Sequence, residues 1–511
     1  MKRTAILLGV LLAGTTACKK NIDLYPESNL TSFTYYNNTD ELRAGINGAY
    51  SGLSGPLFYE WQVTELRSDN AKQGETGSTS VSNQDLNELD MFAVSSTHGG
   101  VLSYWLESYA NIRNSNLILQ KLGVNYDAAS GNSSLGTIGA AISEADRRQF
   151  AGEALFIRAY HYFNLVRLYG GLPLVTQPTS PVAALGVGRS SEADTYKLIE
   201  GDLRTAVSFL SSVPFGQIPS ASIGRANAWA AKGMLAKVYL TQGRKAEALP
   251  LLTDVKDNSG YGLAPTYAGI FAINSEMSSE ILFAIRFRAG GFGTGSPFAN
   301  LFAPLNSGTQ VVNGDGKGLN APTAELDTLI NGDPRKPVLI GAFNTRLYPK
   351  KYLSQVTTVS DAENDWPVLR FADILLMIAE AQGNTPASID LINRVHVRNA
   401  QQPPIDPATI TTTAQFEQAL STERRIEFAF ENQRWFDLVR FNTTLTTVSA
   451  EQTMKDHFAH EFARHYALFP APVTTLSELQ GRVTRERLVL PIPQREIDNS
   501  TQQPLTQNPG Y

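Results

Sequence analysis

Hydrophobic residues recur with the 3.6-residue period of an α-helix along most of the chain. The segment 152–169 shows this period on two opposite stripes, one of Phe156, Ala159, Tyr160 and Phe163 and one of Leu155, Tyr162, Leu165 and Tyr169. Because both faces are apolar, the segment is predicted to be an interior helix. Gly170, Gly171 and Pro173 are the expected signals for its end.

A second helical pattern, from Trp229 to Val255, has the spacing of large, small, aromatic and turn residues found in a tetratricopeptide repeat. The positions are Leu235, Ala236, Tyr239, Gly243, Ala248 and Leu252. Small residues at 236 and 248 allow two antiparallel helices to approach closely. One such pair cannot bury its own face, so we expect further, irregular helix pairs. An unrelated helical hairpin is the alternative.

Three stretches rich in Gly, Ser, Asn and Pro interrupt the helical pattern, at 68–100, 289–320 and 401–413. They are predicted to be loops. Connections of this length are uncommon in compact domains unless they carry function or remain mobile. The chain is therefore predicted to be mostly α with three long loops.

The N-terminus has the pattern of a bacterial export signal. Lys2 and Arg3 precede an apolar run, 5–12, and small residues that lead to Cys18, the single cysteine of the chain. The run is shorter than the roughly 20 apolar residues that span a bilayer. We predict that residues 1–17 are removed and that acylation of Cys18 anchors the protein to a membrane. The alternative is an ordinary secretory signal and an unpaired thiol at this position.

Charge and composition narrow the range of partners. Removal of Lys2 and Arg3 changes the formal net charge from −5 to −7, and an acidic protein is a poor partner for nucleic acid. A hydrophobic content of 42% in a mature chain of about 490 residues is enough for one or two packed cores. We therefore expect a folded body held at a membrane by its lipid.

Charged residues are dense between 423 and 437. Glu427 and Glu431 are one helical turn apart and share a face, whereas a glycosidase needs two carboxylates that face each other at roughly 5 to 9 Å. Neighbouring arginines favour the ionised form of these carboxylates. We predict a structural ion-pair network that ties this segment to Arg370, to Glu380 and to the Pro-rich C-terminal tail.

A histidine cluster contains His457, His460, Glu461 and His465. A zinc protease needs two histidines on one helical face, but His460 and His465 are five residues apart and diverge by about 140°. The cluster is predicted to lie on a solvated amphipathic helix. Chelation of a metal by His457 and Glu461 is the alternative, and no metal or cofactor is predicted.

The glycine-rich run 290–295 has the look of a phosphate-binding loop, but no Lys-Ser/Thr pair follows it. It is predicted to be a flexible surface loop. The sequence also lacks a Gly-x-Ser-x-Gly motif. We therefore expect no catalytic residues.

Short motifs extend from the anchor to the last residue. They are Asp23-Leu24-Tyr25-Pro26, Asn47-Gly48-Ala49-Tyr50, Trp105 with Tyr109, Ile112 and Asn116, Glu153-Ala154 with Arg158-Ala159, Tyr169-Gly170-Gly171-Leu172-Pro173, Asp202-Leu203, Gly224-Arg225, Leu369-Arg370-Phe371-Ala372, Ala379-Glu380-Ala381, Ile392-Asn393 with Arg398, Glu423-Arg424 with Glu427 and Glu431, Arg434-Trp435, Asp437-Leu438, Leu490-Pro491-Ile492-Pro493, Glu496-Ile497, Asn499 and Gln507-Asn508-Pro509-Gly510-Tyr511. Together they resemble the SusD/RagB family of nutrient-binding outer-membrane lipoproteins.

The resemblance implies a mostly α fold, in which an irregular helical scaffold with tetratricopeptide-like helix pairs supports long loops that form a binding face. The implied organisation is a signal peptide at 1–17, a lipid anchor and N-terminal segment at 18–45, a SusD-like N-terminal region at 46–265 and a RagB/SusD C-terminal domain at 266–511. It also implies that the protein is not an enzyme and uses no cofactor.

The resemblance further implies a function. The protein would capture oligosaccharide or polysaccharide on the extracellular side of a Gram-negative outer membrane and pass it to a SusC-like TonB-dependent barrel. A peptide or another nutrient is the alternative cargo. Two other classes stay open, a structural lipoprotein that binds proteins and a surface-anchored hydrolase that uses a loop carboxylate such as Asp69.

Sugar binding in water needs flat aromatic faces and side chains that exchange hydrogen bonds with hydroxyls. We look for them in and beside the first two long loops. The candidate ligand-binding residues there are Arg67, Asp69, Asn70, Phe92, Phe292 and Phe298. Nearby Phe58, Tyr59 and Trp61 are alternatives that could equally well pack in the core.

Overall fold

The computed structural model describes residues 36–74, 81–398, 402–469 and 473–511. The predicted export signal and Cys18 lie outside the described residues. Helices dominate the described part, and its strands form four separate two-stranded sheets, which confirms the predicted mostly α fold. In the described ranges, no helix combines the length and apolar character needed to cross a membrane.

The secondary-structure elements have these bounds. In the N-terminal half the helices are α2 (Thr39–Ser51), α3 (Ser54–Thr64), α4 (Val81–Asp90), α5 (Gly99–Lys121), α6 (Glu144–Tyr169), α7 (Pro181–Ala184), α8 (Glu192–Phe209), α9 (Ala228–Thr241) and α10 (Lys245–Asn258). In the C-terminal half they are α11 (Tyr267–Ile270), α12 (Phe298–Phe302), α13 (Ala324–Leu329), α14 (Lys336–Leu339), α15 (Phe371–Gln382), α16 (Pro386–His396), α17 (Thr413–Glu427), α18 (Arg434–Thr444), α19 (Ala450–Glu461), α20 (Leu476–Arg482) and α21 (Gln494–Asn499). The paired strands are β1 (Ala71–Lys72) with β5 (Ala321–Pro322), β2 (Val124–Asp127) with β3 (Asn132–Leu135), β4 (Ile281–Ile285) with β8 (Trp366–Arg370) and β6 (Ile340–Phe343) with β7 (Arg346–Pro349).

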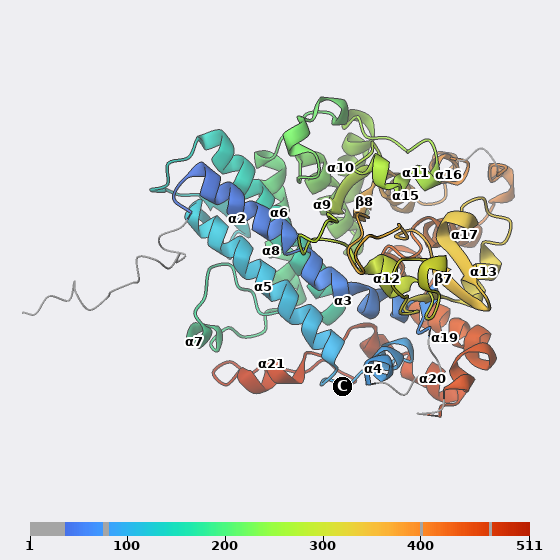
Figure 1. Ribbon diagram of the computed structural model, residues 1–511. Helices are drawn as coiled ribbons and strands as arrows, with labels where there is room; N and C mark the ends of the chain where they lie inside the picture. The colour runs from blue at the N-terminus through green and yellow to red at the C-terminus, as the bar shows by residue number, and fades with distance from the viewer. Residues whose placement is uncertain (1–35, 75–80, 399–401, 470–472) are drawn as a thin grey trace, which may run out of the picture.

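Helix α6 is the central helix of the N-terminal half. It packs against α2, α5 and α8, which lie beside it in Figure 1. Its side chains are buried on all faces from Phe150 to Val166. The predicted interior helix is therefore confirmed, and it ends at Gly170 as the sequence indicates.

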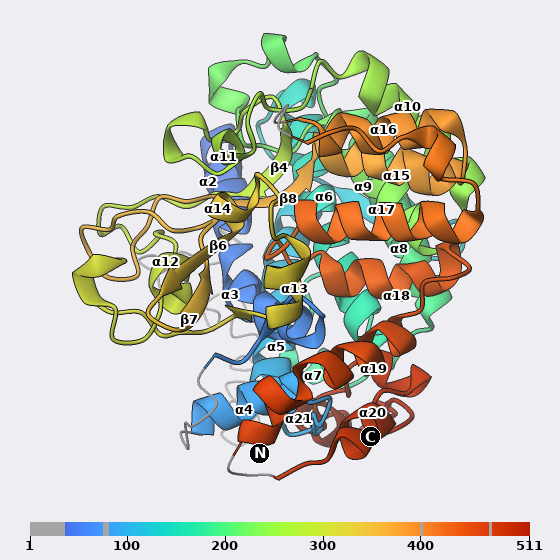
Figure 2. The ribbon, with the colours of Figure 1, turned by 90° about the vertical axis from the view of Figure 1, so that its right-hand side faces the viewer.

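Helices α9 and α10 form the predicted close pair, and Ala236 and Ala248 are both fully buried in it. Helix α10 also packs against α15, and α15 packs against α16 and α17 (Figure 2). The helical pairing thus continues from one half of the sequence into the other. The largest hydrophobic cluster contains residues from both sides of the predicted boundary at 265/266, and the boundary itself stays a prediction.

The predicted loops are only partly correct. The stretch 68–100 contains helix α4, in which Leu86 and Leu89 are buried. The stretch 289–320 contains α12, where Phe298 and Phe302 pack in the core. In each case two aromatic or aliphatic side chains three or four residues apart fix a short helix that the Gly- and Ser-rich composition hides.

Strands β4 and β8 form an antiparallel ribbon between the helical stack and the lobe that contains α12, β6 and β7 (Figure 2). Every residue of β4 is buried. The ladder runs from the pair Ile281 and Arg370 to the pair Ile285 and Trp366. Its inner end therefore lies at Arg370.

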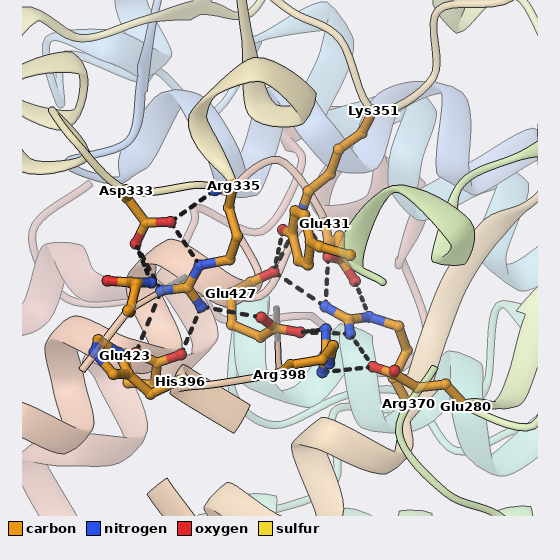
Figure 3. A network of polar contacts seen from close by, with 12 residues as sticks. Glu280, Asp333, Arg335, Lys351, Arg370, His396, Arg398, Glu423, Glu427 and Glu431 are labelled. Carbon is orange, nitrogen blue, oxygen red and sulfur yellow. Dashed lines mark hydrogen bonds and ion pairs between the residues drawn. The ribbon is translucent and has the colours of Figure 1, made fainter. Parts of the chain in front are cut away.

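Arg370 is the centre of a buried network of charges (Figure 3). Its guanidinium donates to Glu280 at 2.6 Å, to Glu427 at 2.9 Å and to Glu431 at 2.8 Å. Burial favours the neutral form of Glu427, but Arg398, Arg370 and Arg335 together hold its pKa well below the usual range. The carboxylates on and after α17 thus fix the end of β8 through charge-assisted hydrogen bonds.

The predicted ion-pair network is confirmed for two of its three links. Arg370 provides the first. Arg440 provides the second, because it binds Asp437 at 2.8 Å and donates a pair of 2.9 Å hydrogen bonds to Glu380. The expected link to the C-terminal tail is wrong. In the described ranges the tail is held from the N-terminal half and from its own chain: the Asn508 amide donates to the backbone oxygens of Tyr169 and Leu490, and the Arg189 guanidinium donates to the backbone oxygen of Thr506 at 2.9 Å.

A short segment beside the network joins the two halves of the chain. The 3-10 helix η2 (Glu65–Arg67) is buried against α18, and the backbone N–H of Asn432 donates to Glu65 at 2.6 Å. The second carboxylate oxygen of Glu65 is buried and has no hydrogen-bond partner among the described residues. This burial raises the pKa of Glu65 to about 8. The side chain is therefore largely neutral at pH 7.

We expect Arg370→Met to lower the free energy of unfolding by about 3 to 5 kcal/mol, because three carboxylates stay buried after their shared partner is lost. Urea unfolding monitored by circular dichroism measures the change. Arg394→Met, at an exposed position on α16, is the matched control and should change stability by no more than about 0.5 kcal/mol. A loss below about 1 kcal/mol for Arg370→Met would contradict the role of the network.

Glu65→Gln tests the neutral state of the buried carboxyl. Folding raises the pKa of Glu65. The contribution of this side chain to the free energy of unfolding is therefore complete below about pH 4.5 and is lost as the pH rises towards 8. The glutamine side chain cannot ionise, so the free energy of unfolding of the variant relative to the wild type should rise by up to about 1.4 kcal/mol per pH unit between these limits. Urea unfolding at pH 5, 6, 7 and 8 gives this difference. Exposed Glu107→Gln is the control, and a difference independent of pH would refute the prediction.

Candidate functional site

A groove of about 600 Å³ opens on the surface where the N-terminal helices meet the ribbon of β4 and β8. Its lining residues come from 47–54, at the end of α2 and the start of α3, from 223–225, and from 284–294, at the end of β4 and in the loop after it, together with Glu363. The volume lies within the usual range for small-ligand sites. This groove is the candidate site.

Tyr50 and Arg225 form the first wall of the groove. The guanidinium carbon of Arg225 lies 5.3 Å from the centre of the Tyr50 ring. Glu153, on α6, binds Arg225 at 2.9 Å, and Arg225 donates to the Asn47 side-chain oxygen at 2.9 Å. Burial and the charge of Glu153 raise the pKa of Tyr50 well above 10, so its hydroxyl stays protonated. The wall therefore places an aromatic side chain beside an amide.

Phe292 and Arg288 form the second wall. The Phe292 ring is 66% exposed, and the Arg288 guanidinium carbon lies 4.9 Å from its centre. The loop that carries them is closed by a 2.9 Å hydrogen bond from the Arg288 N–H to the Thr294 oxygen. Gly291 and Gly293 lie at positive φ on either side of the ring, a conformation that glycine adopts at little cost. The predicted exposed loop is thus a closed turn with an aromatic tip.

The three arginines of the groove differ in their partners. Arg225 is bound to Glu153, and Arg286 is bound to Glu276 and Asp365. Burial raises the pKa of Asp365 to about 7. Arg288 has no carboxylate partner within the described ranges, so its N–H groups are available to a ligand.

Most of the ligand residues predicted from sequence lie in the interior. Arg67 is 1% exposed and is sandwiched between the rings of Phe92, at 5.0 Å, and Trp435, at 4.4 Å. Asp69 accepts two hydrogen bonds from Arg434, and Asn70 accepts one from Arg425. The four predicted residues of this region are Arg67, Asp69, Asn70 and Phe92. Their contacts hold η2 and the segment after it against α17 and α18, and none of the four lines the groove.

The two remaining candidates are phenylalanines of the second loop. Phe298 is buried against Trp366, with ring centres 4.7 Å apart, whereas Phe292 lines the groove. Of the alternatives near the first loop, Trp61 is buried and Phe58 is 37% exposed. Phe292 is therefore the one predicted ligand residue that lines the groove.

The predicted solvated amphipathic helix at the histidine cluster is only partly correct, because α19 has an exposed face but two of the three histidines are buried. Helix α19 packs against α13, α18 and α20, and His457 is buried within reach of Glu325, at 3.2 Å, and Tyr466, at 3.1 Å. His465 is also buried, beside Asp90 at 2.9 Å, and His460 alone of the three is exposed. Within the described ranges, no group of three or more His, Cys, Asp or Glu side chains is arranged to hold a metal.

Sequence reasoning missed most of the groove. Asn47, Tyr50 and Arg225 belong to motifs that carry the family resemblance, but their separation in sequence hides that they form one wall. Arg286 and Arg288 come just before the glycine-rich run and gave no signal of their own. The available clue was the run itself, because a turn built from glycines displays the single large side chain within it.

Comparisons with known proteins agree on one family. A family model described as "SusD family" matches residues 303–511, and one described as "Starch-binding associating with outer membrane" matches residues 22–240. SusD-like protein P2 of Formosa agariphila is 24% identical over 485 residues, which cover 86% of this chain and 91% of that protein.

Solved structures have the same fold. A laminarin-binding SusD-like protein superposes with a TM-score of 0.72 at 25% identity, covering 93% of this chain and 100% of that chain. Surface glycan-binding protein A from Bacteroides thetaiotaomicron, in complex with laminarihexaose, gives a TM-score of 0.67 at 18% identity, with coverage of 92% and 99%. This chain belongs to the SusD family.

Proposed function

We propose that this protein is a glycan-capture lipoprotein of the outer membrane that binds oligosaccharide or polysaccharide in the groove. The observation that carries the proposal is the exposed Phe292 ring, backed by Arg288, in a groove of about 600 Å³. An aromatic face provides apolar contact for the C–H surface of a sugar ring. The free N–H groups of Arg288 and the oxygen of Asn47 provide hydrogen bonds for its hydroxyls.

The nature of the known relatives favours a glycan over a peptide. One solved relative is described as laminarin-binding and another was solved with laminarihexaose, and the N-terminal family model carries the description of starch binding. A peptide stays the alternative cargo, and titration of the protein with glycans and with peptides distinguishes the two. Delivery to a SusC-like TonB-dependent barrel rests on the family, as do outer-membrane placement and anchoring through Cys18.

The groove favours binding rather than catalysis. Among the described residues that line it, Glu363 is the single carboxylate, whereas glycoside hydrolysis generally uses two that face each other at roughly 5 to 9 Å. The nearby Asp365 is bound to Arg286, and Asp361 to the backbone of the loop. Asp69, the carboxylate on which the hydrolase alternative depended, is buried between Arg425 and Arg434.

Phe292→Ala tests the site. We expect it to weaken binding of a glycan by about tenfold, on the order of 1.4 kcal/mol, because the stacking face is lost. Isothermal titration of the purified protein with laminarihexaose, a panel of polysaccharides and a peptide mixture measures binding. Phe58→Ala, at a half-exposed ring outside the groove, should leave the affinity unchanged. Binding to peptides alone would refute the glycan proposal, and an unchanged affinity in Phe292→Ala would refute the site.

Cys18→Ala tests the anchor. We expect the variant to lose incorporation of labelled palmitate and to leave the membrane fraction, because the acylated thiol is the proposed attachment point. Fractionation and labelling of cells measure both. Protease added to intact cells should digest the wild-type protein if it faces outward. A variant that keeps its label and its membrane association would refute the anchor.

A further inference from the structure

The two chain segments that leave the outer end of the β4 and β8 ribbon continue side by side, but their backbone ladder stops at the pair Ile285 and Trp366. Three side-chain carboxylates take the place of the missing carbonyl acceptors. Asp365 accepts the Phe287 N–H at 2.9 Å, Glu363 accepts the Ala289 N–H at 2.8 Å, and Asp361 accepts the N–H groups of Gly290 and Gly291 at 2.8 and 2.9 Å.

The spacing of these acids explains the arrangement. Asp361, Glu363 and Asp365 are two residues apart, so in an extended chain their side chains point to the same side. A carboxylate reaches farther than a backbone carbonyl, so the loop stands away from the segment that holds it. The bonds accepted by Glu363 and Asp361 are charge-assisted and therefore stronger than the neutral ladder bonds that they replace. We call these three residues the carboxylate row.

The same segment also holds the returning arm of the loop. Ala362, between two acids of the row, exchanges backbone hydrogen bonds with Ser296 at 2.8 and 2.9 Å. Gly295 packs so closely on Asp361 that a side chain at this position would clash with its carboxylate. Both arms of the loop are thus fixed on the segment 361–365, and Phe292 lies at the tip between them.

We propose that the carboxylate row consists of positioning residues, which hold the loop 286–294 so that Phe292 and Arg288 form the second wall of the groove. The inference rests on the proposed function for the identity of the ligand. The positioning of the loop by the carboxylate row can be tested without any ligand. Asp361 is the most direct test position, because it alone accepts both glycine N–H groups at the base of the tip.

Hydrogen exchange measured by mass spectrometry tests the structural half. In Asp361→Ala the peptide that contains Gly290 and Gly291 should exchange faster, because two amides lose their acceptor. Asp361→Asn keeps one oxygen acceptor and should restore most of the protection. Asp390→Ala, an exposed carboxylate on α16, is the matched control and should exchange in this peptide as the wild type does. Unchanged exchange in Asp361→Ala overturns the proposal whether or not a glycan binds.

Titration with laminarihexaose tests the functional half in the same variants. Asp361→Ala should weaken binding by about tenfold. In the Phe292→Ala background it should weaken binding hardly further, because the effects of two substitutions that act through one contact are not additive. Asp361→Asn should bind nearly as the wild type does. Full additivity of the two alanine variants, or wild-type affinity in Asp361→Ala, overturns the positioning role.

These experiments separate the two proposals. A wild-type protein that binds no glycan, with faster loop exchange in Asp361→Ala, would refute the proposed function and support the row as the structural holder of the loop. Normal glycan binding with unchanged loop exchange would support the function and overturn the row.

Discussion

The buried charge network around Arg370 fixes the part of the molecule from which the groove is built. Three carboxylates surround this one guanidinium in an interior where an unpaired ion is costly. Because Glu280 immediately precedes β4 and Arg370 ends β8, the network sets the inner end of the ribbon. The opposite end of the same two strands carries the loop with Phe292. A scaffold held by ionic bonds at one end can therefore present a binding loop at the other.

Arginine has two different uses in this fold, and the difference lies in which of its N–H groups are occupied. In the interior, Arg370 and Arg440 are surrounded by carboxylates and hold secondary-structure elements together. At the groove, Arg225 is held by Glu153, whereas Arg288 is held by an aromatic ring and by no carboxylate in the described part of the chain. A guanidinium stacked on a ring keeps its donors in the plane free. That geometry suits a ligand rich in hydroxyl groups.

The sequence was sufficient for features that depend on local pattern and insufficient for those that depend on distant pairing. The period of apolar residues predicted α6 and the pair α9 and α10, and the density of charge near α17 predicted the buried network. Arg67 and Asp69 were expected in a ligand loop because their segment is polar. Their partners, Trp435 and Arg434, are more than 350 residues away in the chain, so nothing local showed that these charges are buried.

The glycine-rich run illustrates how a motif can mark the right place for a different chemical reason. A loop that binds phosphate does so with free backbone N–H groups. Here the N–H groups of Ala289, Gly290 and Gly291 are already bound to Glu363 and Asp361, so the backbone has no donor left at these positions for an anion. The run instead places a side chain at the groove, and the groups that this wall offers to a ligand are the Phe292 ring and the Arg288 guanidinium. Both groups suit a sugar, whose ring offers C–H surface on its faces and hydroxyls at its edge.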